Sequence, residues 1–257
     1  MSLPDGSTPV AIVTGGTQGI GWAIASRLAA EGWSVVAADL VPGNTSDKGS
    51  AIGYRELDIR DQALVGAAFT EIASTYGHLE LLVNNAGIQI HGPTESLPLE
   101  SWRDVVDVNL HGTFNCLQAA GRIMLAAGSG SIVNIVSVAA DRGAAGRAPY
   151  AATKAAIVSL TRTAGTEWAA RGVRVNAVGP GYVDTGVYRA AVAKGQLDQA
   201  AILDRIPMRR LAQADEIAAT VSFLASPAAS YITAQTLYVD GGYLNDYGVA
   251  TSALPPQ

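Results

Sequence analysis

Apolar runs of strand length alternate with longer segments of helical periodicity between residues 10 and 242. Seven short runs are apolar on both faces, which is typical of strands buried in a parallel sheet. They cover residues 10–16, 33–40, 51–59, 79–87, 130–138, 173–181 and 235–242. Helical patterns cover residues 19–32, 61–76, 101–127, 149–172 and 215–225. This order predicts an α/β fold with one doubly wound parallel sheet of about seven strands and helices on both faces.

The alternation is interrupted once and is followed by a tail. Residues 185–208 form a polar, mobile-looking insert, and we expect residues 243–257 to be an irregular tail. No linker, composition break or internal repeat divides the chain. We therefore predict a single domain over residues 1–257.

A glycine-rich stretch, TGGTQGIG at residues 14–21, joins the first expected strand to the first expected helix. Glycines let the backbone approach a pyrophosphate, and a helix N-terminus offers free N–H groups and a positive dipole end. The spacing of Gly15, Gly19 and Gly21 differs from G-x-G-x-x-G, so a purely structural turn is the alternative. The position after the first strand favours a dinucleotide in a Rossmann-type fold.

The choice of dinucleotide depends on the end of the second expected strand, Asp39. A carboxylate there hydrogen-bonds the adenosine ribose hydroxyls and repels a 2′-phosphate. No arginine or lysine stands beside Asp39, and the loop carries Gln18 rather than a base. These residues favour NAD over NADP, while the alternative is that Asp39 only begins the turn before Pro42. Asp58, at the end of the third strand, could reach the adenine through its carboxylate or its backbone.

Composition narrows the remaining classes of function. Hydrophobic residues make up 49% of the 257 residues and charged residues 15%, which favours surface buried between subunits. The net charge of −5 disfavours a nucleic-acid partner. A single cysteine excludes an internal disulfide, and His78, His91 and His111 lack metal-ligand spacing. With no signal peptide and no long apolar run, we expect a soluble cytoplasmic protein without a metal site or membrane contact.

Six motifs follow one another: TGGTQGIG, NNAG at residues 84–87, Asn109, Ser137, YAATK at residues 150–154 and PGYVDT at residues 180–185. In this order and at these positions, the chain resembles the short-chain dehydrogenase/reductase family over residues 10–242. The resemblance implies an NAD-dependent oxidoreductase that interconverts a secondary alcohol and a ketone. It also implies a homotetramer that pairs the helices at residues 101–127 and 150–171 across one axis. The last strand and its neighbouring helix would pair across another.

The family's catalytic serine, tyrosine and lysine map onto Ser137, Tyr150 and Lys154, and its helix asparagine maps onto Asn109. Tyr150 and Lys154 are four residues apart and share one helix face. The ammonium and the positive nicotinamide ring are expected to lower the Tyr150 pKa from near 10, so that Tyr150 acts as general acid or base. Ser137 would hold the substrate oxygen, and Asn109 would support Lys154 through a backbone carbonyl and a water. In isolation, Tyr150 could instead be a capping aromatic residue and Lys154 a solvated charge.

The resemblance also implies cofactor contacts at the strand ends. The residues expected to bind NAD are Gly15, Thr17, Gln18, Gly19, Ile20, Asp39, Leu40, Asp58, Ile59, Asn85, Ala86, Gly87, Tyr150, Lys154, Pro180, Gly181, Val183 and Thr185. The Val183 backbone and the Thr185 hydroxyl are expected to hold the carboxamide and so orient the nicotinamide face.

The substrate is expected between the nicotinamide, the loops after NNAG and Ser137, and the insert at residues 185–208. That insert resembles the substrate loop of family members acting on sugars, sugar acids and small secondary alcohols. The expected substrate contacts are Ser137, Tyr150, Gln89, Ala139, Arg147, Tyr182 and Tyr188. Gln89 and His91 favour a polyol, a sugar or a hydroxy acid, although His91 could equally face solvent. An inward Arg142 or Arg147 would bind an anion, the alternative being a surface ion pair or a subunit contact.

Three other functions stay open. One is a reductase of a hydrophobic ketone in the same family, and another is an epimerase or dehydratase that keeps its NAD bound. Such epimerases more often carry a G-x-x-G-x-x-G loop and a longer chain with a separate substrate region. The third is a non-catalytic NAD-binding or NAD-sensing protein, against which the presence of Ser137, Tyr150 and Lys154 argues.

Overall fold

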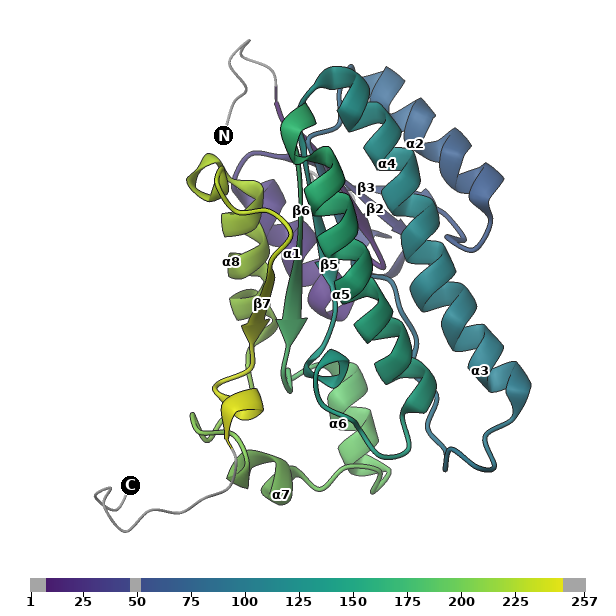
Figure 1. Cartoon of the computed structure of the whole chain (residues 1–257), viewed down its shortest axis with the longest axis vertical. Helices are drawn as coiled ribbons and strands as arrows, with labels where there is room; N and C mark the ends of the chain where they lie inside the picture. The colour runs from purple at the N-terminus through teal and green to yellow at the C-terminus, as the bar shows by residue number, and fades with distance from the viewer. Residues whose placement is uncertain (1–7, 47–51, 247–257) are drawn as a thin grey trace.

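Seven parallel strands form one sheet in the order β3-β2-β1-β4-β5-β6-β7 (Figure 1). The computed structural model describes residues 8–46 and 52–246. The strands are β1 Val10–Thr14, β2 Ser34–Asp39, β3 Ile52–Glu56, β4 Leu81–Asn84, β5 Gly130–Ile135, β6 Val173–Pro180 and β7 Thr236–Val239. The chain starts at the centre of the sheet, runs to one edge, and then crosses back to the other. This topology confirms the predicted doubly wound Rossmann-type fold.

Helices cover both faces of the sheet. Helices α1 (Gly19–Ala30) and α8 (Ala214–Ala225) pack together on one face. The other face carries α2 (Gln62–Tyr76), α4 (Thr113–Ala127) and α5 (Ala148–Trp168). Strand β1 shows the division, because Ala11 and Val13 belong to the first core while Val10 and Ile12 belong to the second. The sheet is therefore buried on both sides, as its apolar strands require.

The helix predicted for residues 101–127 is helical throughout but is not one regular α-helix. It consists of α3 (Leu99–Val106), a π-helical turn at Asp107–Gly112, and α4. A Cβ at Gly112 would lie 2.6 Å from the Ile59 side chain, so this turn packs closely against the loop after β3. The turn also carries Asn109, which is fully buried. Such π-turns occur frequently at functional sites.

The polar insert contains two helices that the hydrophobic pattern did not reveal, α6 (Gly186–Ala193) and α7 (Gln199–Asp204). Thr185 caps α6 by accepting a hydrogen bond from Tyr188 N at 3.2 Å, and Asp198 caps α7 by accepting one from Ala201 N at 3.1 Å. Both helices lie at the end of the sheet to which the arrows of β6 and β7 point (Figure 1). The insert therefore stands beside the strand ends where ligands bind in this fold.

The end of the chain is only partly described. Residues 243–245 form a 3₁₀ turn after β7. The predicted irregular tail from residue 247 onward lies outside the described residues. Among the helices of residues 8–46 and 52–246, none has the length and apolar character needed to cross a membrane.

Candidate active site

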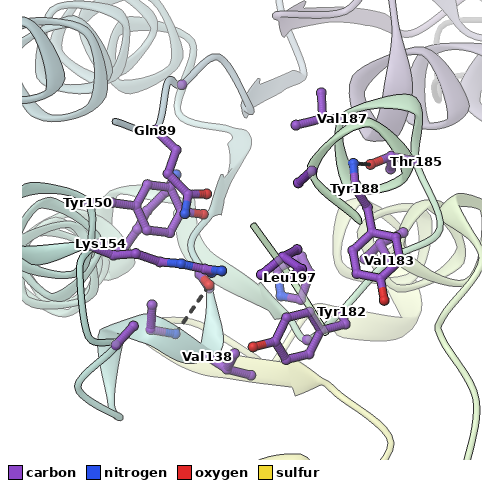
Figure 2. A pocket seen from close by; sticks show the side chains of 18 of the residues that line it. Gln89, Val138, Tyr150, Lys154, Tyr182, Val183, Thr185, Val187, Tyr188 and Leu197 are labelled. Carbon is purple, nitrogen blue, oxygen red and sulfur yellow. Dashed lines mark hydrogen bonds between the residues drawn. The ribbon is translucent and has the colours of Figure 1, made fainter. Parts of the chain in front are cut away.

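A cavity of about 1050 Å³ opens at the carboxyl ends of the central strands. Its walls come from the loops after β4, β5 and β6, from the first turns of α1 and α5, and from α6. Figure 2 shows Tyr150 and Lys154 on one side of this cavity and Tyr182 and Tyr188 on the other. Five of the six motifs thus contribute residues to one cavity, at the usual ligand site of a doubly wound sheet, while Asn109 is buried and does not line it.

The glycine loop is closely packed on one side and open at Gly19. Gly15 and Gly19 have φ values of +60° and +55°, in the left-handed region that favours glycine. A Cβ at Gly15 would lie 2.9 Å from the Cα of Ala86, and a Cβ at Gly21 would clash with the carbonyl oxygen of Gly15. Around a Cβ at Gly19, by contrast, no atom lies within 4 Å. The loop backbone is therefore free to meet a ligand at Gly19.

The N-terminus of α1 fits a phosphate group. No side chain caps this helix and its first turn contains no acidic residue, so its first N–H groups are not taken up by a side chain. Ile20 in this turn lines the cavity. An uncapped helix start behind an open glycine loop is a suitable site for the pyrophosphate of a dinucleotide.

Asn85 holds the glycine loop in place rather than pointing freely at a ligand. Its side-chain amide donates to the carbonyl oxygens of Gly15 at 2.9 Å and Thr14 at 3.1 Å. Ala86 N donates to the hydroxyl of Thr14 at 3.1 Å. Part of the NNAG motif therefore connects the end of β4 to the end of β1. Gly87, the last residue of the motif, lines the cavity.

Asp39 lies beside the glycine loop at the end of β2. Its carboxylate accepts a hydrogen bond from the Thr17 hydroxyl at 2.7 Å and one from Leu40 N at 2.8 Å. The carboxylate thus stands next to the loop that would hold the pyrophosphate. This is the position from which an acidic residue reaches an adenosine ribose.

Asp58 and Ile59 are largely engaged within the protein. The Asp58 carboxylate forms an ion pair with Arg60 at 2.6 Å, and this hydrogen-bonded partner lowers its pKa. The Ile59 side chain is buried, and its carbonyl oxygen accepts a hydrogen bond from Asn115 at 3.0 Å. Of the two routes considered for Asp58, the carboxylate is occupied by Arg60 and the backbone is the better candidate.

Ser137, Tyr150 and Lys154 converge at the end of β5. Lys154 is 5% exposed, and its Nζ donates to the carbonyl oxygen of Ile135 at 2.7 Å. The same Nζ lies 5.6 Å from the centroid of the Tyr150 ring. The Ser137 hydroxyl accepts a hydrogen bond from Ala139 N at 3.2 Å and also hydrogen-bonds Tyr150. The end of β5 thus holds the lysine and the serine close to the Tyr150 side chain.

Burial controls the protonation of this group. It raises the pKa of Tyr150, although the hydrogen bond to Ser137 and the charge of Arg147 act in the opposite direction. Burial also lowers the pKa of Lys154 to about 8. The expected fall in the Tyr150 pKa is therefore not found in the protein alone, because the loss of hydration outweighs the nearby charges.

Asn109 orders the loop after β4 instead of contacting Lys154 directly. Its Oδ1 accepts a hydrogen bond from Ile88 N at 2.8 Å, and its Nδ2 donates to the Ile88 carbonyl oxygen at 2.9 Å. A Cβ at Gly87 would lie 3.2 Å from Asn109 Oδ1 and 3.7 Å from Lys154 Nζ. The side chains of Asn109 and Lys154 thus both pack against Gly87.

The segment after β6 lines the cavity as expected, with Pro180, Gly181, Val183 and Thr185 all at its wall. Gly181 N donates to the carbonyl oxygen of Val239 at 2.9 Å, which ties this segment to β7. The Thr185 hydroxyl is already engaged as the cap of α6. A hydroxyl has two acceptor sites and one donor, so Thr185 can still donate to a ligand.

Every residue expected to contact the substrate lines the cavity, as do His91 and Arg142. Gln89 Nε2 and His91 Nε2 lie 2.6 Å apart, which makes them one polar unit. The sequence did not identify other wall residues, notably Val138, Val187, Leu197, Arg205 and Tyr243. Tyr243 follows the last strand, so the strand-end rule could have found it. In the described part of the chain, no group of three or more histidine, cysteine or acidic residues could hold a metal ion.

Comparison with known proteins gives matches over almost the whole chain. Residues 15–244 match a family described as enoyl-(acyl carrier protein) reductase. A 3-oxoacyl-(acyl-carrier-protein) reductase from Staphylococcus aureus is 40% identical over 243 residues, which cover 91% of this chain and 98% of that protein. A cis-4-hydroxycyclohexanecarboxylate dehydrogenase from Sinomonas cyclohexanicum is 42% identical over 242 residues, with 91% and 96% covered.

Solved structures give the same result at the level of the fold. A gluconate 5-dehydrogenase from Burkholderia cenocepacia, in complex with NADP and tartrate, superimposes with a TM-score of 0.86. The two sequences are 37% identical, and the alignment covers 93% of this chain and 96% of the other. The likeness therefore includes both the strand order and the segments that build the cavity.

Proposed function

Since the chain belongs to the short-chain dehydrogenase/reductase family of oxidoreductases, we propose that it interconverts a secondary alcohol and a ketone using NAD. The observation that carries this proposal is the convergence of Ser137, Tyr150 and Lys154 at the wall of the cavity. The cofactor, when bound, accepts or supplies the hydride. The protein holds the reactants together and moves the proton.

Tyr150 is the group that moves the proton in this proposal. During oxidation its phenolate oxygen takes the proton of the alcohol, and during reduction its phenol donates a proton to the carbonyl oxygen. Ser137 holds the same substrate oxygen through its hydroxyl. Lys154, which is charged below a pKa of about 8 and whose Nζ lies 5.6 Å from the centroid of the Tyr150 ring, would stabilise the phenolate. A positive nicotinamide ring next to Tyr150 would further favour the phenolate, against the burial that raises its pKa.

The preference for NAD rests on Asp39. Its carboxylate lies against the glycine loop, and the residues that follow it, Leu40 and Val41, carry no charge. A 2′-phosphate at this position would meet the negative charge of Asp39. The Burkholderia relative was solved with NADP, so the cofactor is a property to be measured for this chain.

The substrate class proposed is a small polar hydroxyl compound: a polyol, a sugar, a sugar acid or a small secondary alcohol. The Gln89–His91 pair supports it, because these side chains supply hydrogen bonds for hydroxyl groups at the cavity wall. Two of the similar proteins, the gluconate and the hydroxycyclohexanecarboxylate dehydrogenases, are named for substrates that carry a hydroxyl and a carboxylate.

A second candidate is the reduction of a more hydrophobic ketone. One wall of the cavity is apolar and includes Val187 and Leu197 with the ring of Tyr182 (Figure 2). The Staphylococcus relative is named as a reductase of acyl groups attached to a carrier protein. An acetoacetyl thioester therefore belongs among the substrates to be tested.

We also propose a homotetramer. Trp102 on α3 and Phe114 on α4 are 38% and 43% exposed in the single chain, as is Phe223 on α8 at 41%. Large apolar residues at such exposure favour helix pairing between subunits. These positions agree with one interface over the long helices and another beside β7.

The test of the proposed activity is absorbance at the NADH band. Purified protein is mixed with NAD or NADP and a panel of polyols, aldoses, sugar acids and simple secondary alcohols, and the acetoacetyl thioester is tested with NADH and NADPH. The proposal predicts turnover with NAD and at least one hydroxyl compound. Turnover only with NADP would reject the Asp39 argument, while turnover of only the thioester would favour the second candidate. Bound cofactor without any turnover would contradict the enzymatic proposal.

A further inference from the structure

The cavity is basic although the protein as a whole is acidic. The chain has a net charge of −5, yet the described residues that line the cavity include five basic side chains and no acidic one. The basic residues are Arg142, Arg147, Lys154, Lys194 and Arg205. A low-dielectric cleft lined by charges of one sign concentrates ligands of the opposite sign.

One carboxylate beside the lining, that of Asp184, is already paired. On the far wall, Asp184 lies next to the lining residues Val183 and Thr185 but forms an ion pair with Arg189 at 2.9 Å. Asp184 and Arg189 therefore neutralise each other outside the lining.

Two of the cavity arginines are held by the protein. Arg142 donates to the carbonyl oxygen of Tyr243 at 3.2 Å, and its guanidinium lies 5.4 Å from the centroid of the Tyr243 ring. The guanidinium of Arg205 lies 5.2 Å from the same ring. These contacts fix both side chains on one aromatic residue.

Arg147 differs from both. It is half-buried at the cavity wall, and its guanidinium has no hydrogen-bond or ion-pair partner within the described residues. Its positive charge acts on groups from several parts of the cavity wall, because it lowers the pKa of Tyr150, of Tyr182 and of His91. A guanidinium presents five N–H donors in a planar fork, and an unpaired one in a cleft is suited to a planar anion such as a carboxylate.

The facing wall limits the rest of the ligand. Val187, Leu197 and the rings of Tyr182 and Tyr188 form an apolar surface across from Tyr150 (Figure 2). A ligand between the two walls can therefore place a hydrocarbon part on this surface and an anionic group at Arg147.

We propose that the substrate is a hydroxy acid, or the corresponding oxo acid, whose carboxylate is bound by the unpaired guanidinium of Arg147. Its hydroxyl or carbonyl oxygen lies at Ser137 and Tyr150. The inference rests on the proposed function and narrows its substrate class. The carboxylate is unchanged by the reaction: the C–H bond of the alcohol carbon breaks, two electrons leave as hydride to the oxidised nicotinamide, and the O–H proton passes to the Tyr150 phenolate.

The first test measures binding, so that it does not depend on turnover. Cyclohexanecarboxylate and its neutral isostere cyclohexanecarboxamide are titrated by calorimetry into the full chain, alone and with NADH. A charge-assisted bidentate contact predicts that wild type binds the carboxylate about 10- to 100-fold more tightly than the amide. R147Q should lose most of the difference, because only the more distant charges of the cavity remain, and R147K should retain more of it than R147Q does. R122Q, an equal charge change on the exposed face of α4, should leave the difference intact.

Two results would overturn the inference: equal binding of the two ligands by wild type, or an unchanged preference in R147Q. A second measurement separates it from the proposed function. The kcat/KM values of 3- and 4-hydroxycyclohexanecarboxylate are compared with those of their carboxamides and of cyclohexanol. Oxidation of the neutral alcohols at undiminished kcat/KM by wild type would support the activity and reject the anion site. Carboxylate binding through Arg147 without any oxidation would support the anion site and contradict the proposed activity.

Discussion

At the scale of single residues, the account depends on a lysine buried where its charge is costly. Lys154 is 5% exposed, and burial lowers its pKa from 10.5 to about 8. Within the described residues, its Nζ donates one hydrogen bond, to the carbonyl oxygen of Ile135. A residue kept in so unfavourable a place is typical of a functional site, where stability is given up for chemistry.

Replacing this lysine should therefore stabilise the fold. Because the pKa of Lys154 is lower in the folded chain, the unfolded chain binds more protons between about pH 8 and 10.5. The charged lysine therefore lowers the free energy of unfolding by its full amount below pH 8. This loss of stability disappears as the pH rises through that range. At pH 7, the free energy of unfolding of Lys154→Met should exceed that of wild type by on the order of 3 kcal/mol. The loss of the hydrogen bond to Ile135 reduces this gain. Urea unfolding at pH 7 and pH 10 checks this. A variant that is less stable at pH 7 would show that Lys154 is structural.

A second prediction at the scale of residues concerns Asp39 and the choice of cofactor. Removal of its carboxylate should lower kcat/KM for NAD about 10- to 100-fold, because a charged hydrogen-bond acceptor contributes roughly 1.5–3 kcal/mol. The difference in kcat/KM between NAD and NADP should become smaller. The comparison is kcat/KM for both cofactors in Asp39→Ala and in Thr17→Val, which removes the 2.7 Å contact but keeps the charge. Equal effects of the two variants on both cofactors would mean that Asp39 only supports the loop.

At the scale of elements, hydrophobic periodicity was sufficient for the sheet and the long helices. It could not show the π-helical turn, because a single short π-turn is not distinguishable in an apolar pattern that is read over a whole helical region. It also missed α6 and α7, which are too short to form alone and depend on caps at Thr185 and Asp198 and on packing of Tyr188 and Ile202. The sequence identified the reactive residues of the site, but it did not identify the contacts that hold them.

The glycine loop allows a matched test of the cofactor site. Gly19 and Gly77 both have a left-handed φ, +55° and +84°, and a Cβ at either would meet no atom within 4 Å. Each change to alanine should therefore cost about 1–2 kcal/mol of stability. Only Gly19→Ala should also weaken NADH binding, by about tenfold or more, because the methyl group enters the space beside the loop.

Thermal unfolding and a fluorescence titration with NADH measure these two effects in the same samples. Equal NADH affinity in the two variants would mean that the pyrophosphate does not lie at Gly19. Gly77 is a suitable control because it ends α2, an element that contributes nothing to the lining of the cavity.

At the scale of the whole molecule, the doubly wound order brings the ends of β4, β5 and β6 to one cavity. Residues as far apart in the sequence as Ile20 and Tyr243 then line one cavity, and this could be predicted because strand-end placement follows from topology. The net charge could not predict the basic cavity, since a sum over the chain hides where the charges lie. Cytoplasmic location and tetramer formation stay predictions.

The prediction at the scale of the whole molecule concerns the number of subunits in the assembly. Wild type should have the mass of four copies of the 26.4 kDa chain in light scattering after size-exclusion chromatography. Phe114→Glu, on the long helix expected to pair, should give smaller species because a charge would enter an apolar contact. Leu64→Glu is the matched control on α2, where the side chain is 53% exposed and no pairing is expected. A monomeric wild type would contradict the proposed assembly.

The central claim is that the Tyr150 phenol transfers the proton, and one substitution tests it most directly. Tyr150→Phe removes a single oxygen, and Tyr231→Phe removes the same atom from a fully exposed ring. The account predicts that Tyr150→Phe still binds NADH but loses about 100- to 10,000-fold in the rate of NADH formation with the best substrate. Tyr231→Phe should match wild type. A Tyr150→Phe protein that forms NADH at the wild-type rate would contradict the account.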